Sequence, residues 1–91
     1  TLLEKITYLA DYIEPSRAGF AGLEELRRTC YEDLDAAMEL AARMSLDEVS
    51  GKGQAPHINT LEAWRYYRGA LSERGIGPVH AEGIPDNIEF N

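Results

Sequence analysis

The sequence predicts an all-α fold of about four helices with an irregular C-terminal tail. Leucine, isoleucine, methionine and alanine recur at the spacing of amphipathic helices along most of the chain. Two capping patterns, at Thr1 and at Asn59, mark helix starts. Alternating polar and apolar residues, the signature of a half-buried strand, are scarce. These observations favour packed helices over any fold that contains a sheet.

The first helix is expected over residues 1–13, with Thr1 and Glu4 spaced as a capping box. Apolar residues at helical spacing define its expected core stripe: Leu2, Ile6, Leu9, Ala10 and Ile13. At about 100° per residue, Asp11 points away from this stripe. Tyr8 and Tyr12 widen the apolar part of the helix, which is typical of an inner helix with contacts on more than one side.

Two helices are expected in the middle of the chain. Pro15 ends the first helix, because the residue before proline avoids the α conformation. After a glycine-flanked turn, a short helix is expected over residues 23–29 and a longer one over residues 31–49. The longer helix is expected to bury Leu34, Ala37, Met38, Ala41 and Met44, and to turn Asp33, Glu39 and Arg43 to water.

A last helix should follow the loop at residues 51–56, which contains glycine and proline. It carries Leu61, Trp64, Arg68 and Leu71 on one side and is expected to stop near Gly75. Residues 76–91 show little periodicity, so we expect an extended tail that buries too little to offset its ordering entropy. The expected division is a helical portion over residues 1–75 and a tail over residues 76–91.

Composition excludes several classes of function. Ninety-one residues make one small domain at most. The net charge of −7 argues against nucleic acid and against an anionic membrane surface as partners. Cys30 is the single cysteine, which favours a reducing, cytoplasmic setting. The chain opens at Thr1 inside an expected helix, as a piece of a longer protein would.

One segment stands out chemically, namely residues 8–17. Asp11 lies in an otherwise apolar helix, where a carboxylate is costly to bury unless it is paired or binds a metal. Arg17 follows six residues later, and its planar guanidinium suits phosphate oxygens. A surface ion pair between the two is the alternative. Asp33 and Asp35, by contrast, read as helix-start residues that complement the helix dipole.

Residues 5–17, Lys-Ile-Thr-Tyr-Leu-Ala-Asp-Tyr-Ile-Glu-Pro-Ser-Arg, resemble a stretch of the symmetrical bis(5′-nucleosyl)-tetraphosphatases of the HD superfamily. In that family the stretch holds the last metal-binding aspartate. The resemblance continues at residues 20–27, 33–37 and 53–64, and covers about residues 1–71. Ala21 and Ile58 stand where the family usually has proline. The family's upstream half, with its histidines and His-Asp pair, has no counterpart here.

The resemblance implies the C-terminal part of an HD-type helical domain. Asp11 would be one ligand of a two-metal cluster, with iron or another transition metal, and Arg17 would meet a phosphate. The nucleoside end of the site would be lined by Pro56, His57, Ile58 and Asn59. The substrate would be a dinucleoside tetraphosphate, cleaved to two nucleoside diphosphates. No catalytic residue is expected in this part, which should be inactive alone and bind no metal tightly.

A second hypothesis, from another class, is a non-catalytic helical module. Such a module would dock on a partner or self-associate through the exposed face of the first helix, where uncovered apolar side chains would lie.

Overall fold

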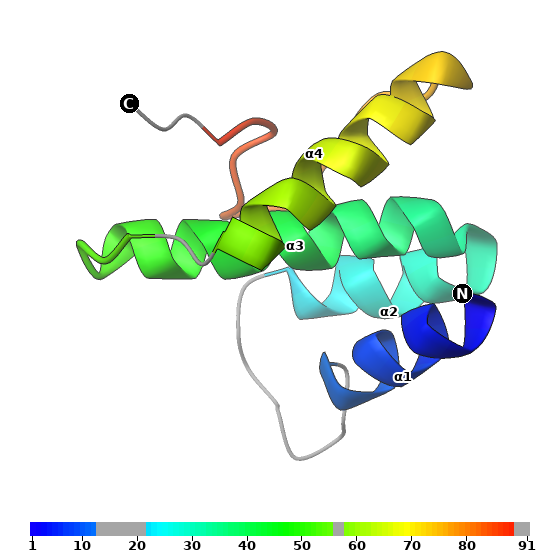
Figure 1. Cartoon of the computed structure of the whole chain (residues 1–91), viewed down its shortest axis with the longest axis horizontal. Coiled ribbons are helices and arrows are strands. Elements are labelled where there is room, and N and C mark those ends of the chain that lie inside the picture. Colours follow the sequence, from blue (N-terminus) through cyan, green and yellow to red (C-terminus); the bar gives the residue numbers. More distant parts are fainter. Residues whose placement is uncertain (13–21, 56–57, 89–91) are drawn as a thin grey trace.

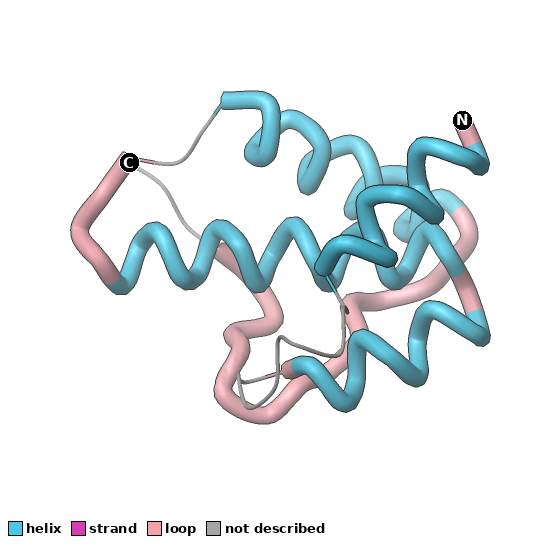
Figure 2. Tube along the Cα trace, turned by 90° about the horizontal axis from the view of Figure 1, so that it is seen from below, coloured by secondary structure: helices cyan, strands magenta, loops and turns pink. Residues whose placement is uncertain are grey.

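The structure is a computed structural model that describes residues 1–12, 22–55 and 58–88; for Tyr8, Asp11 and Tyr12 it describes the backbone alone. Within these ranges the chain forms α1 (Leu2–Tyr12), α2 (Leu23–Glu32), α3 (Leu34–Gly51) and α4 (Ile58–Glu73) (Figure 1). The only strand-like feature among the described residues is an isolated bridge between Ala81 and Ile84. Figure 2 shows the described residues as helices joined by loops and turns. The predicted all-α class is therefore confirmed.

Helix α3 is the centre of the bundle. Helix α4 crosses it on one side, while α1 and α2 pack against it on the other (Figure 1). Ten of its residues are buried: Ala36, Ala37, Met38, Glu39, Leu40, Ala41, Ala42, Arg43, Met44 and Leu46. Since this set covers the whole circumference of the helix, α3 is an inner helix rather than a surface helix with one apolar stripe.

Asp33 separates α2 from α3. Its extended backbone (φ −159°) breaks the helix, and its Oδ1 accepts hydrogen bonds from the backbone N–H groups of Asp35 and Ala36. This is an N-cap, which satisfies donors that a helix start leaves without partners. The helix-start interpretation of Asp33 is therefore confirmed. The expected boundary near residue 30 was wrong, because α2 continues to Glu32 until this cap ends it.

Helix α1 begins as predicted, because Thr1 Oγ1 accepts the backbone N–H of Glu4 at 3.2 Å. Its expected core stripe is largely wrong. Leu9 is buried against α3, but Leu2 and Ile6 are 62% and 47% exposed, and Ala10 is also exposed. Helical spacing shows which residues share a side of a helix, but not which side meets the next helix. Ile13 lies outside the described residues.

Gly22, directly before α2, adopts a backbone conformation that favours glycine. Its φ of +85° lies in the left-handed region. A Cβ placed there would lie 3.1 Å from the side chains of both Met44 and Ile84. This glycine therefore lets the start of α2 approach α3 and the C-terminal segment closely.

Helix α4 starts at Ile58, so Asn59 lies within the first turn rather than at the expected N-cap. The predicted inner side is confirmed, with Leu61, Trp64 and Leu71 buried and Arg68 half-buried. The helix also ends as predicted, since Gly75 adopts a left-handed φ of +73° and the Ile76 N–H returns to the Leu71 carbonyl at 2.9 Å.

Residues 76–88 pack against the helices, so the expectation of a loosely packed tail was wrong. Ala81 and Ile84 join the core formed by Leu9, Leu26 and α3, and Ile88 joins Leu46 and Trp64. The segment has no helical period because it buries isolated side chains from turns, such as the one closed by the Ile84 N–H and the Ala81 carbonyl. No helix in the described ranges is long and apolar enough to cross a membrane.

Candidate functional site

Helix α1 carries Asp11 next to its last residue, Tyr12. Two contacts hold the helix in place. Leu9 is buried in the core, and Lys5 Nζ pairs with Asp35 Oδ1 at 2.6 Å. Lys5 also lies 5.6 Å from the centre of the Tyr67 ring, which adds a cation–π contact to α4. These contacts hold α1 against α3 and, through Lys5, against α4. The side chain of Asp11 lies outside what the structure describes.

The other predicted site residues are only partly described. Arg17, Pro56 and His57 lie outside the described residues. Ile58 and Asn59 form the start of α4, where Ile58 is 57% exposed and Asn59 is exposed too. Their exposure agrees with a surface available to a ligand, and the arrangement of the predicted set as a whole lies outside what the structure describes.

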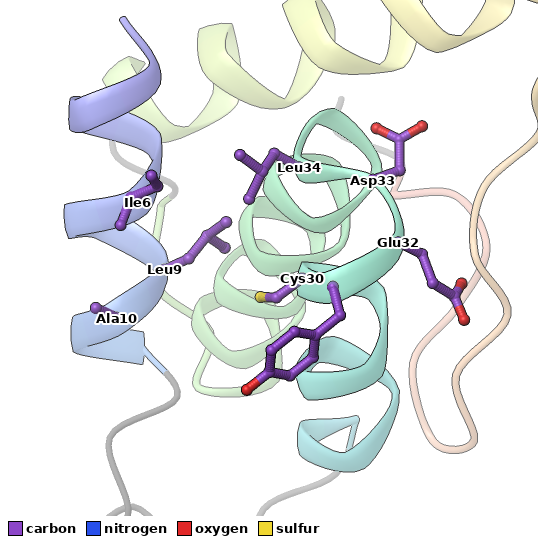
Figure 3. A pocket seen from close by; sticks show the side chains of 8 residues that line it. Ile6, Leu9, Ala10, Cys30, Glu32, Asp33 and Leu34 are labelled. Atoms are coloured by element: carbon purple, nitrogen blue, oxygen red, sulfur yellow. The ribbon is translucent and has the colours of Figure 1, made fainter.

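A pocket of about 480 Å³ opens between α1 and α2 (Figure 3). It is lined by Ile6, Leu9, Ala10, Cys30, Tyr31, Glu32, Asp33 and Leu34. Leu9 of α1 faces Cys30 and Leu34 across it, and most of the lining is apolar (Figure 3). Sequence reasoning did not identify this pocket, although the apolar residues on several sides of α1 were the signal for it.

Two polar groups of the lining, Cys30 and Asp33, are unsuited to catalysis. Burial raises the pKa of the Cys30 thiol, which leaves it protonated and weakly nucleophilic near neutral pH. The hydrogen bond from Arg74 is the main reason that the pKa of Asp33 lies below its usual value. Asp33 is therefore an ionised cap and not a proton donor. The pocket can hold apolar groups, but these residues give it no acid–base or nucleophilic chemistry.

Charged residues join three helices near the start of α3. Arg74, just after α4, pairs with Asp33 Oδ2 at 2.7 Å and approaches Asp35 Oδ2 at 3.9 Å. Asp35 in turn holds Lys5 of α1. These pairs fix the ends of α1, α3 and α4 relative to one another, and so position the helix that carries Asp11.

A second charged cluster is buried further along α3, and sequence reasoning missed it. Glu39 and Arg43, expected in water, are fully buried and form a bidentate pair through Arg43 Nε and Nη2 at 3.0 and 3.1 Å. Trp64 Nε1 donates to Glu39 at 2.8 Å, and Arg68 pairs with the same carboxylate at 3.3 Å. The pair is buried because α4 and the C-terminal segment cover this side of α3.

The same cluster binds the C-terminal segment. Arg43 donates to the carbonyls of Val79 at 2.6 Å and Pro85 at 2.9 Å, and Arg68 donates to the carbonyl of Asp86. These bonds satisfy the buried guanidinium and fix a segment without regular structure. The cluster is therefore an organising element of the fold.

Among the described residues, no three or more His, Cys, Asp or Glu side chains gather in a way that would hold a metal ion. Asp11 and His57 are not part of that set, because their side chains are not described.

Comparison with known proteins gives the decisive observation. The chain is 55% identical over 66 residues, 72% of its length, to the symmetrical bis(5′-nucleosyl)-tetraphosphatase of Bacillus subtilis (strain 168). The chain is thus similar to symmetrical bis(5′-nucleosyl)-tetraphosphatases. A protein of the same name from Halalkalibacterium halodurans is 38% identical over 64 residues, 70% of this chain. The resemblance predicted from the sequence is confirmed.

The chain spans about a third of the length of these curated relatives, 35% and 34% respectively. No protein-family profile matches it, and no solved structure does.

Proposed function

We propose that these residues are the C-terminal part of an HD-type, metal-dependent phosphohydrolase that cleaves dinucleoside tetraphosphates symmetrically. Water would add across the central phosphoanhydride bridge, and two nucleoside diphosphates would leave. The observation that carries the proposal is the 55% identity over 66 residues to a protein named for this activity. Because the chain spans only about a third of that protein, the activity is assigned to a longer polypeptide.

Asp11 is the residue that we assign to metal binding. Its carboxylate is a suitable donor, and the packing of Leu9 together with the Lys5–Asp35 pair fixes the helix that bears it. A bound two-metal cluster, with iron as the proposed metal, would polarise phosphoryl oxygens and supply hydroxide near neutral pH. One carboxylate falls short of the roughly four donors that a stable site needs, so the isolated chain is proposed to be inactive and to bind no metal tightly.

The remaining roles concern substrate binding. Arg17 would donate to a phosphate, since its guanidinium offers two parallel N–H groups. Pro56, His57, Ile58 and Asn59 would contact the nucleoside, and the exposure of Ile58 and Asn59 at the start of α4 supports that assignment. The setting proposed for this enzyme is cytoplasmic.

The test uses a full-length protein that contains these residues, with diadenosine tetraphosphate as substrate. Chromatography of the products should show adenosine diphosphate alone, whereas equal amounts of the tri- and monophosphate would contradict symmetric cleavage. Asp11→Asn should abolish turnover and lower metal content. Arg17→Ala should retain the metal and weaken nucleotide binding about ten- to a hundredfold, the loss of one charged phosphate contact. Wild-type kinetics in both variants would disprove the site assignment.

The second candidate is a non-catalytic helical module, and the exposure of Leu2 and Ile6 on α1 is the observation in its favour. Sedimentation of the 91-residue chain over a range of concentrations tests the self-associating form of this module. A dimer that Ile6→Glu disrupts would support it, and a monomer throughout would contradict it.

A further inference from the structure

The C-terminal segment that follows α4 is bound to the helices through its main chain. Arg43 of α3 donates to the carbonyls of Val79 and Pro85 at 2.6 and 2.9 Å. Arg68 of α4 donates to the carbonyl of Asp86. Figure 1 draws the segment in orange to red beside these two helices. Every residue offers a main-chain carbonyl, so these bonds hold a peptide backbone and do not depend on one particular side chain.

Two isoleucines four residues apart add the side-chain contacts of the segment. Ile84 belongs to the core cluster that contains Met44, and Ile88 belongs to the cluster of Leu46 and Trp64. Each isoleucine is 8% exposed. Main-chain hydrogen bonds combined with separate sites for a few apolar side chains are the contacts by which a short peptide docks on a protein.

The buried charges beneath the segment are paired without it. Glu39 accepts two bonds from Arg43, at 3.0 and 3.1 Å, and it also accepts from Trp64 and Arg68. All four residues belong to α3 and α4. If the segment left, water would replace its carbonyls as acceptors, and Glu39 and Arg43 would keep each other as charged partners. Release therefore costs the contacts of the segment itself and leaves no buried charge stranded.

The connection between α4 and the segment is suited to release. Arg74 is held by Asp33 at 2.7 Å, so the end of α4 has its own anchor. The next three residues, 75–77, are exposed, and two of them are glycine. Release also returns the conformational entropy that an irregular segment loses when it is ordered. Segments with few buried contacts open at a lower free energy than the helices they cover.

We propose that the C-terminal segment leaves α3 and α4 as a unit while the helices stay folded, and that the uncovered surface binds the same segment of a second copy of this chain. A second copy is the partner that the contacts specify, because its segment offers the same carbonyls and the same two isoleucines. Such an exchange joins two copies reversibly. The tethered segment competes with an effective concentration of the order of millimolar, so exchange is weak while its own contacts are intact.

Fluorescence anisotropy tests the proposal, with a labelled and amidated synthetic peptide of residues 76–88 as the probe. The peptide is titrated with the unaltered chain, Ile88→Val and Ile88→Ala in about 0.15 M salt, which screens the net charge of −7. Each substitution weakens the segment of the chain but not the peptide. The peptide should therefore bind about two- to tenfold more tightly to Ile88→Val, and at least about tenfold more tightly to Ile88→Ala. Glu82→Ala, at an exposed position of the same segment, is the matched control and should bind like the unaltered chain.

Equal affinity for all four chains would overturn the proposal, because the peptide would then bind elsewhere. A second peptide that carries Ile84→Asp and Ile88→Asp should not bind, and equal binding of the two peptides would also overturn it. So would the absence of binding to an Ile88→Ala chain whose circular dichroism shows intact helices. If that chain loses its helices, the comparison of Ile88→Val with the unaltered chain decides. No substrate or metal enters the titration, so the result is independent of the proposed phosphohydrolase activity.

Discussion

Removing the buried guanidinium of Arg43 should cost much more stability than removing an exposed cation at the same helical spacing. Arg43→Met retains most of the aliphatic stem but removes both bonds to Glu39 and the donors for the carbonyls of Val79 and Pro85. Breaking one partner of a buried ion pair typically costs about 3–5 kcal/mol, because a charge is left buried without compensation. Here Trp64 and Arg68 still bind the Glu39 carboxylate, which favours the lower end of that range.

Lys52→Met is the matched control. Lys52 pairs with Glu48 at 3.1 Å across the same four-residue separation near the end of α3, but both side chains are about 60% exposed. An exposed pair of this kind contributes about 0.3–0.5 kcal/mol. The same substitution at the two positions therefore isolates the effect of burial.

Urea unfolding followed by circular dichroism measures both variants. With an m-value of roughly 1–2 kcal/mol per molar urea for a small domain, Arg43→Met should lower the midpoint by about 1.5 M at least. Lys52→Met should lower it by less than about 0.5 M. Losses of free energy that agree within about 1 kcal/mol would refute the inference that the Glu39–Arg43 pair is buried and organises the fold.

Three further experiments probe separate features. Gly22→Ala should destabilise the fold by about 1–3 kcal/mol, because residue 22 has a positive φ. Gly69→Ala is the control: its Cβ would lie in open space within α4, so the change should be neutral or stabilise the fold by up to about 1 kcal/mol. A urea midpoint that is higher for Gly22→Ala than for Gly69→Ala would contradict this geometry. Since Arg74 holds the pKa of Asp33 low, this carboxylate stabilises the fold above about pH 4 and ceases to do so as pH falls through the lowered value. Arg74→Gln should flatten that acid limb of stability against pH, and an unchanged curve would argue against the pairing. Ile88→Ala should lower the free energy of unfolding by about 2–4 kcal/mol, because Ile88 is buried in the core. A thermal midpoint equal to that of the unaltered chain would indicate instead that the C-terminal segment is loosely packed.

The helical class was predictable because local signals agree along the chain. Apolar residues such as Met38 and Ala41 recur at helical spacing, and the end of α4 at Gly75 follows from the left-handed conformation that glycine permits. The start of α3 was misplaced because Asp33 acts as a cap only through its own backbone geometry, which the spacing of apolar residues does not report.

Burial of Glu39 and Arg43 was not predicted, since two opposite charges four residues apart are usually an exposed helix pair. Besides each other, their partners lie 25 to 42 residues away along the chain, from Trp64 to the carbonyl of Pro85. One signal existed: these two are the only charged residues between positions 36 and 46. A pair of charges isolated in so apolar a run indicates an inner helix.

Asp11, by contrast, was singled out from its sequence motif, because spacing alone left a surface ion pair with Arg17 as an alternative. The fold adds that α1 is held in place by Lys5 and Leu9. Spacing did not tell which side of α1 meets α3, so the apolar residues on several sides of α1 did not by themselves locate the pocket beside Ile6 and Ala10.

The Glu39–Arg43 pair also limits the routes by which this sequence can diverge. Two apolar residues can replace a buried ion pair at little cost when both change together, but each single step leaves a charge stranded. Here even the joint replacement would leave the Val79 and Pro85 carbonyls without their donor. A set of substitutions that removes the pair without loss of stability must therefore alter α3 and the C-terminal segment together. Residues in these two distant parts of the sequence are expected to change together during evolution.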